Sequence, residues 1–125
     1  MADSLGERLL LGLHGGVLIP FLVAAVMKTL QGSSLVAAIT AAGMIEPMLG
    51  PLGLAGESGK VLATLAIGAG TMTASHLNDD FFWVAANSAR LSSGRAVVAI
   101  TGGTLLQGLV AVAILTVLSL IVPGL

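Results

Sequence analysis

The chain has 125 residues, of which 56% are hydrophobic and only 9% charged, whereas a soluble domain carries about 25% charged residues. The mean hydropathy is +1.05. Five Lys and Arg nearly balance six Asp and Glu, which excludes a basic face for nucleic acid, and the lack of cysteine excludes a disulfide framework or a Cys-based metal site.

Long charge-free stretches indicate helices in a bilayer. Charged residues are absent from 9–27, 29–45, 61–78 and 96–125. A helix needs about 20 apolar residues to cross the hydrocarbon core, with a working range of roughly 17–25, so these segments reach or approach spanning length. A soluble domain of this size lacks the polar surface to cover them all. We therefore predict an all-α integral membrane protein whose surroundings are the lipid bilayer.

The N-terminal third predicts a hairpin. Residues 1–12 form a polar leader and the start of a helix, and residues 13–47 form the hairpin itself. Its arms are separated by the polar tetrapeptide 31–34, and the second arm, 35–45, would be roughly 17 Å long, too short for a ~30 Å core. A long arm, a polar break and a short arm predict a re-entrant hairpin, which is tolerated at membrane depth only inside protein or beside a wet cavity.

The middle of the chain predicts a broken helix over residues 60–89. It follows a loop rich in Pro and Gly, and its apolar first half contains Gly68 and Gly70, small residues that let helices approach closely. The polar run 75–80 then interrupts the apolar pattern before a short helix resumes. Two discontinuous helices are the best sequence indication of a substrate site in a secondary transporter.

Residues 95–122 predict a final, uninterrupted spanning helix. Arg90 and Arg95 precede it and nothing charged follows. By the positive-inside rule, the loop with the two arginines is cytoplasmic and the C-terminus external. We expect a multi-pass protein of the cytoplasmic (inner) membrane.

The first break carries candidate anion-binding groups. Ser33 and Ser34 are expected to cap the following helix, whose free N–H groups and positive dipole end favour a carboxylate. Gln31 would add hydrogen bonds, and Lys28 would add a compact point charge. The alternative is an ordinary surface turn, with Lys28 extending its ammonium to the lipid headgroups.

The second break carries candidate proton-binding groups. An ionisable residue inside a membrane costs about 2.5–3.5 kcal/mol on insertion scales, so it needs a partner or a task. Desolvation can bring a carboxylate such as Asp79 into the neutral range, and a histidine such as His76 is already close to it. Either could take up and release a coupling proton. The alternative is a loop at the membrane surface with Trp83 as an interfacial anchor.

Enzymatic and metal sites are not indicated. His14 and His76 lack the clustered Cys or carboxylate spacing of a zinc site, and His14 is interpreted as a packed or helix–helix hydrogen-bonded histidine. His76 and Asp79 could do acid–base chemistry in principle, but no nucleophile elbow or metal ligand set accompanies them. We expect no enzyme, no metal and no cofactor.

Two motifs in the chain resemble those of a known family. Lys28-Thr29-Leu30-Gln31-Gly32-Ser33-Ser34, followed by residues 38–43, resembles a segment of the gluconate permease family of proton symporters. Residues 66–70, leading into Ser75-His76-Leu77-Asn78-Asp79 and Phe82-Trp83, resemble its second signature, and the resemblance runs from about Gly16 to the C-terminus. Family members usually have small residues after the Asn-Asp pair, where this chain has Asp80 and Phe81, a departure that bears on the substrate more than on the fold.

The resemblance implies a fold and a site. The chain would be the second repeat of an inverted-repeat transporter, with the hairpin tip at 31–34 and the broken helix unwound at 75–79. It would carry gluconate or a similar small hydroxy-carboxylate together with a proton, which Asp79 or His76 would bind. The substrate-binding residues implied are Lys28, Gln31, Gly32, Ser33, Ser34, Ser75, His76 and Asn78.

The resemblance also implies a partner. Family members are expected to be several times longer, so the first repeat would be missing here, and a site at a repeat interface needs both repeats. An N-terminal repeat or a homo-oligomer partner is therefore expected. The alternative is a truncated or accessory membrane subunit with no transport activity of its own, which would associate through small-residue faces such as Gly102-Gly103 and Gly108.

Overall fold

The computed structural model describes residues 16–121, and every regular element in that range is helical. The all-α prediction is therefore confirmed for this range. The polar leader 1–12 and His14 lie outside it. In chain order the elements are α2 (Leu18–Gln31), α3 (Ser34–Ile45), the 3-10 turn η1 (Glu46–Met48), α4 (Glu57–Thr71), α5 (Asp80–Ser88), α6 (Ser93–Ala96), the π-helical turn η2 (Val97–Thr101) and α7 (Gly102–Ile121).

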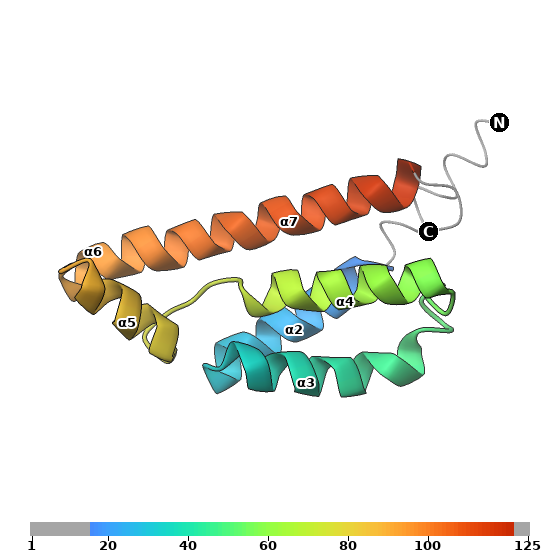
Figure 1. The fold of residues 1–125 in the computed structure, drawn as a ribbon, viewed down its shortest axis with the longest axis horizontal. Helices are drawn as coiled ribbons and strands as arrows, with labels where there is room; N and C mark the ends of the chain where they lie inside the picture. The colour runs from blue at the N-terminus through green and yellow to red at the C-terminus, as the bar shows by residue number, and fades with distance from the viewer. Residues whose placement is uncertain (1–15, 122–125) are drawn as a thin grey trace.

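Helices α2 and α3 pack against each other as an antiparallel pair (Figure 1). Gly32 ends α2 in the left-handed conformation, with φ of 71°. Ser33 is extended and caps α3, its hydroxyl accepting from the Val36 N–H at 3.4 Å. Ser34 is the first residue of α3 rather than a second cap. The helices have 14 and 12 residues, or about 21 and 18 Å, so both are shorter than the hydrocarbon core.

The second break is longer than the sequence pattern predicts. Helix α4 begins at Glu57 and ends at Thr71, and α5 begins at Asp80, so residues 72–79 are non-helical. The hydroxyls of Thr71 and Thr73 donate to the carbonyls of Gly68 and Ala69, at 2.9 and 2.8 Å. Helix α4 therefore ends before the polar run begins, with both hydroxyls bonded to carbonyls of its own last turns.

The last three elements form one continuous helix from Ser93 to Ile121. It has 29 residues and contains an 18-residue stretch with a mean hydropathy of 2.3, so it is long and apolar enough to cross a membrane by length and composition. It is the one helix among residues 16–121 that meets this test. The helix is not uniform, because the Gly102 N–H reaches the Val97 carbonyl five residues back, which is the π-type bond. The sequence pattern predicts an uninterrupted helix here and does not indicate this turn.

Helix α4 is the centre of the fold and packs on α2, α3 and α7 (Figure 1). A Cβ at Gly70 would overlap the Phe21 carbonyl oxygen and Ala24, so this glycine allows the close crossing of α2 and α4. Gly68, by contrast, has open space at the same position. Two buried apolar clusters surround α4. One consists of Val17, Phe21, Leu62, Ala66, Val112 and Leu115, and the other of Ala24, Ala41, Ile45, Leu54, Ala63 and Ile67.

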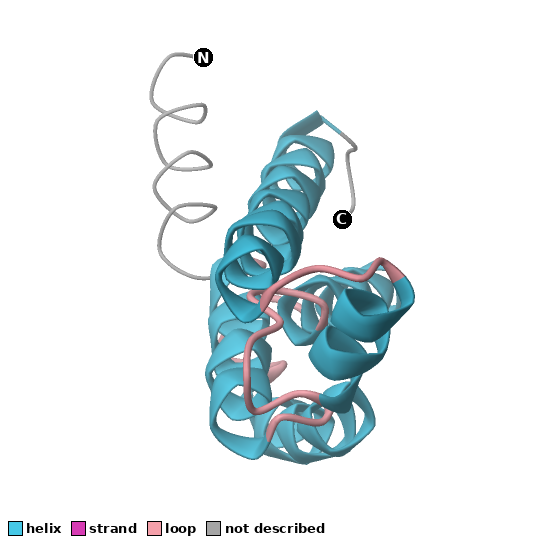
Figure 2. Cartoon of the chain, turned by 90° about the vertical axis from the view of Figure 1, so that its left-hand side faces the viewer, coloured by secondary structure: helices cyan, strands magenta, loops and turns pink. Residues whose placement is uncertain are grey.

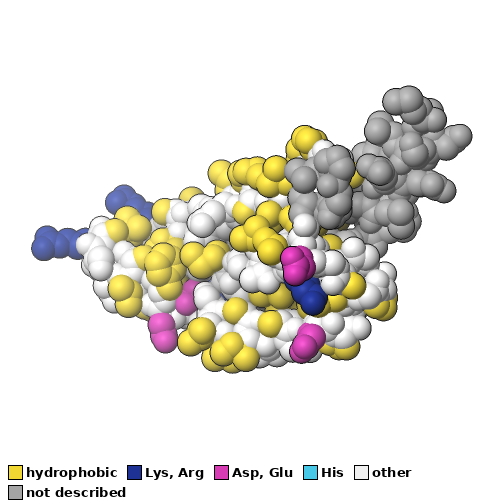
Figure 3. Space-filling view, turned by 45° about the vertical axis from the view of Figure 1, so that its right-hand side comes forward, with side chains coloured by type: hydrophobic (Ala, Val, Ile, Leu, Met, Phe, Trp, Pro, Cys, Tyr) yellow, Lys and Arg dark blue, Asp and Glu magenta, His cyan; other side chains and the backbone are white. Residues whose placement is uncertain are grey.

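The surface is strongly apolar. Large side chains such as Leu35, Val98 and Ile121 are 71%, 77% and 68% exposed. Figure 3 shows apolar side chains spread over one face, with the charged side chains gathered at the left end and toward the lower right. Soluble monomers rarely expose contiguous apolar surface of this extent, so the faces of these helices suit lipid or another apolar partner.

Candidate functional site

The two helix breaks meet in space, and we call residues 28–34 together with 71–79 the junction. Two hydrogen bonds join them directly, from Asn78 to the Leu30 carbonyl and from Ser34 to the Thr71 carbonyl. Both breaks lie in the left half of Figure 1, and Figure 2, viewed from that side, shows the loop segments framed by helix ends. Residues far apart in the sequence thus form one polar centre.

A buried ion pair lies at the heart of the junction. The Lys28 ammonium is 2.5 Å from Asp79 Oδ2 across 51 positions of sequence, and the side chains are 0% and 5% exposed. Lys28 lies in the last turn of α2, where the helix dipole favours a cation, and Asp79 caps the start of α5, where it favours an anion. The other Asp79 oxygen, Oδ1, accepts from the Phe81 N–H at 3.1 Å.

This burial excludes the alternative in which Lys28 extends to the headgroups. The sequence pattern indicated both residues but not their pairing. It assigned Lys28 to the substrate and Asp79 to the proton, whereas the structure places the two charges against each other.

Each break satisfies backbone groups that the other leaves open. The last carbonyls of a helix have no partner within the helix. Asn78 Nδ2 donates to the Leu30 carbonyl at the end of α2, at 3.2 Å, and Ser34 Oγ donates to the Thr71 carbonyl at the end of α4, at 2.9 Å. Each break thereby supplies a hydrogen-bond donor to a helix-terminal carbonyl of the other.

Gly32 is required by the junction for two reasons. Its positive φ favours glycine, and a Cβ there would overlap the carbonyl oxygen of Asn78. The backbones of the two breaks therefore touch at this residue.

The remaining sequence-predicted residues also lie at the junction. Gln31 is exposed at the end of α2, Ser33 caps α3, and Ser75 is buried in the break. The Nδ1 atom of His76 is buried and has no hydrogen-bond partner among residues 16–121. A buried polar atom of this kind needs a partner that the described chain does not supply.

Two further functional residues, Thr101 and Thr104, were not predicted from the sequence. Their hydroxyls contact the backbone of Ser75. Their one sequence signal was a hydroxyl within an apolar stretch, which often marks a helix–helix hydrogen bond in membranes.

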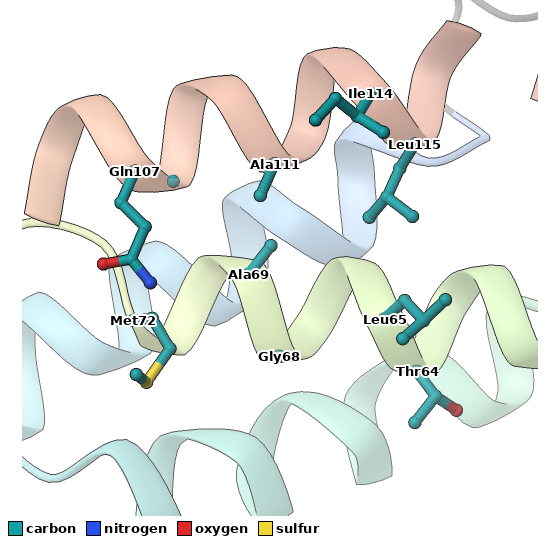
Figure 4. A pocket seen from close by; sticks show the side chains of 10 residues that line it. Thr64, Leu65, Gly68, Ala69, Met72, Gln107, Ala111, Ile114 and Leu115 are labelled. Carbon is teal, nitrogen blue, oxygen red and sulfur yellow. The ribbon is translucent and has the colours of Figure 1, made fainter. Parts of the chain in front are cut away.

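A groove between α4 and α7 is chemically different from the junction (Figure 4). Its volume is about 530 Å³, and Thr64 and Gln107 are the polar side chains among the residues that line it. A carboxylate in this groove would meet no cation from the lining residues, so the groove does not suit an organic anion. The other lining residues are Leu65, Gly68, Ala69, Met72, Gly108, Ala111, Ile114 and Leu115.

Gly108 requires a correction to the expected small-residue association face. It is buried, and a Cβ there would overlap the side chain of Thr73. It therefore serves contact within the chain rather than with another protein. Gly102 and Gly103 are exposed and have open space around them.

Comparison with known proteins gives one family. The profile of the GntP family permease matches residues 3–121. The high-affinity gluconate transporter of Escherichia coli (strain K12) is 35% identical over 81 residues, covering 65% of this chain and 18% of the relative. The gluconate permease of Bacillus licheniformis is 38% identical over 68 residues, covering 54% and 14%.

A third relative is named for L-idonate rather than gluconate. The Gnt-II system L-idonate transporter of Escherichia coli (strain K12) is 42% identical over 62 residues, covering 50% of this chain and 13% of the relative. The chain thus spans less than a fifth of the length of these curated relatives. No solved structure gives a significant match.

Proposed function

Because the chain belongs to the GntP permease family, we propose that it forms the anion-binding part of a proton-coupled carrier for gluconate or a similar small hydroxy-carboxylate. The family and these relatives are permeases and transporters rather than enzymes. The observation that carries the proposal is the buried Lys28–Asp79 pair at the meeting point of two helix breaks. Such a pair is costly in a membrane and marks a functional site.

The substrate carboxylate would bind at the first break. The Lys28 ammonium supplies the charge, and the start of α3, capped by Ser33, supplies backbone N–H groups and a positive dipole end. Hydroxyl groups of a sugar acid would meet Gln31 and Asn78, both exposed at the junction. The unpartnered Nδ1 of His76 would gain a hydrogen bond from the same ligand.

The ion pair supports a physical coupling between anion and proton. Breaking a buried pair by removing one partner costs about 3–5 kcal/mol, because the other charge is left uncompensated. When an incoming carboxylate takes the Lys28 ammonium, Asp79 would be that uncompensated charge. A proton taken from water onto the Asp79 carboxylate removes the charge and the cost. Anion entry and proton entry would then be one event, with His76 as an alternative proton carrier.

The remainder of the carrier would come from outside the chain. We propose that α2 and α3 form a re-entrant hairpin within the second of two inverted repeats, in a multi-pass protein of the cytoplasmic membrane. The loop with Arg90 and Arg95 would be cytoplasmic. An N-terminal repeat or a second copy would complete the site, which is supported by the large apolar surface that the described helices leave uncovered.

Gluconate uptake in cells that naturally produce the chain tests this function with every natural partner present. Lys28→Met should abolish the uptake that depends on the chain, and Lys60→Met, at an exposed position of α4, should leave it unchanged at equal membrane abundance. Full uptake in the Lys28→Met cells would contradict the proposal. Uptake that is lost on deletion of the chain but kept in Lys28→Met would indicate an accessory subunit instead.

A further inference from the structure

The long C-terminal helix holds the backbone of the second break at Ser75. The Ser75 N–H donates to Thr104 Oγ1 at 2.9 Å, and Thr101 Oγ1 donates to the Ser75 carbonyl at 2.6 Å. Ser75 is only 3% exposed. Two hydroxyls therefore supply the donor and the acceptor that this residue would have had in an intact helix. We call Thr101 and Thr104 the threonine clamp.

The roles of the two hydroxyls are fixed by their own helix. A threonine hydroxyl has one proton to donate and two lone pairs to accept with. Thr104 donates its proton to the Ile100 carbonyl at 2.7 Å, so toward Ser75 it can only accept. Thr101 has its proton free for the Ser75 carbonyl. The clamp is therefore directional, and neither hydroxyl can replace the other.

The clamp is located at the π-helical turn. Thr101 is the last residue of η2, and Thr104 lies in the first turn of α7. The same turn supports the helix that follows the break, because Ile100 packs against the buried cluster of Phe82, Ala86 and Ala96. The break is thus anchored on η2 at Ser75 and again through α5, on either side of Asp79. Turns of the π type are frequent at functional sites.

The backbone beside the clamp is strained. Ala74 has φ of 53°, a left-handed conformation that disfavours residues other than glycine. Such a conformation persists only where the surroundings over-determine it. The next residue, Ser75, is held on both of its backbone groups, which is the kind of constraint required.

We propose that Thr101 and Thr104 are positioning residues for the Lys28–Asp79 pair. The clamp fixes the break four residues before Asp79, so a shift of the long helix at η2 moves Asp79 relative to Lys28. The inference has two parts. The structural part is that the clamp holds the backbone of the second break at Ser75 in place, and it depends on the two hydrogen bonds alone. The functional part is that the clamp controls the position of the Asp79 carboxylate, and it rests on the proposed function.

A cysteine reporter tests the structural part. The chain has no cysteine, so Ser75→Cys provides a single thiol, and the clamp remains because it uses the backbone of that residue. Thiol labelling in native membrane vesicles should be slow, and adding Thr101→Val or Thr104→Val should accelerate it about threefold for each hydroxyl removed, the typical worth of an interhelical hydrogen bond. Thr116→Val is the matched control, since among residues 16–121 its hydroxyl bonds only to the Val112 carbonyl of its own helix, at 2.8 Å.

Gluconate uptake and its pH profile, measured with Ser75 intact, test the functional part. Thr101→Val and Thr104→Val should lower uptake by about threefold or more and shift the pH profile, and Thr101→Ser, which keeps the hydroxyl, should restore both. Labelling at the parental rate in both valine variants would overturn the clamp. Faster labelling with unchanged uptake and pH profile would overturn the positioning role. Faster labelling in a chain that supports no gluconate uptake at all would uphold the clamp and contradict the proposed function.

Discussion

The junction and the groove both involve helix α4, but one buries polar and charged groups and the other is lined by apolar side chains. At the C-terminal end of α4 the junction buries a lysine, an aspartate and open backbone groups, and pairs them across two breaks. Along the flank of α4 the groove is lined almost wholly by apolar side chains. A polar group in an apolar environment needs a specific hydrogen-bonding or charged partner, whereas apolar packing depends mainly on side-chain volume and tolerates substitution by another apolar residue. Substitutions should therefore cost much at the junction and little in the groove.

The largest effect should come from separating the ion pair. Lys28→Met leaves Asp79 buried without a counter-charge and should lower the free energy of unfolding by about 3–5 kcal/mol. Adding Asp79→Asn removes the orphan charge and should restore most of that loss without restoring gluconate uptake. Unfolding titrations in detergent would measure both variants. Equal stability of the single and double variants would show that the charges do not depend on each other.

A smaller effect is expected where the backbones of the two breaks touch. Gly32→Ala places a Cβ in overlap with the Asn78 carbonyl and also at a positive φ. Gly53→Ala has a similar positive φ, 73°, but its Cβ would have no neighbour within 4 Å, so it is the matched control. The control should cost roughly 1–2 kcal/mol, the price of a left-handed alanine, and Gly32→Ala should cost clearly more. The difference between the melting temperatures of the two variants measures the contact between Gly32 and the Asn78 backbone. Equal melting temperatures would indicate that the two breaks lie farther apart.

The smallest effect is expected in the groove. A Cβ at Gly68 meets nothing within 4 Å, so Gly68→Ala should not destabilise the fold and, because alanine favours a helix over glycine, should raise the free energy of unfolding by about 0.5–1 kcal/mol. Gly70→Ala, half a turn along the same helix, would press into α2 and is the sensitive counterpart. Thermal unfolding of the pair would show the contrast, and equal losses would mean that the groove is filled.

The sequence predicted the helical class and the position of both breaks because these depend on local chemistry. A run of polar residues such as 31–34 interrupts an apolar helix whatever surrounds it. Ser33 is a good cap for the same reason. The end of α4 was placed too late, because the apolar pattern continues through Met72 and Ala74, beyond the last helical residue, Thr71.

The pairing of Lys28 with Asp79 could not be predicted from pattern, because it spans 51 positions and depends on how α2 packs on α4. A useful signal was present all the same. One cation and one carboxylate in otherwise apolar segments need partners, and each is the obvious partner of the other. The π-helical turn gave no such signal, since Val97–Thr101 contains neither glycine nor proline.

Proton uptake on gluconate binding tests the central claim most directly. The chain, purified with its natural partners, would be titrated with gluconate in weakly buffered solution near neutral pH while a pH indicator follows the solution. Exchange of Asp79 for the substrate carboxylate on Lys28 predicts that about one proton leaves the solution for each gluconate bound, a count that follows from the single uncompensated carboxylate. The Asp79→Asn variant should take up none. Gluconate binding without proton uptake, or the same uptake in Asp79→Asn, would contradict the account.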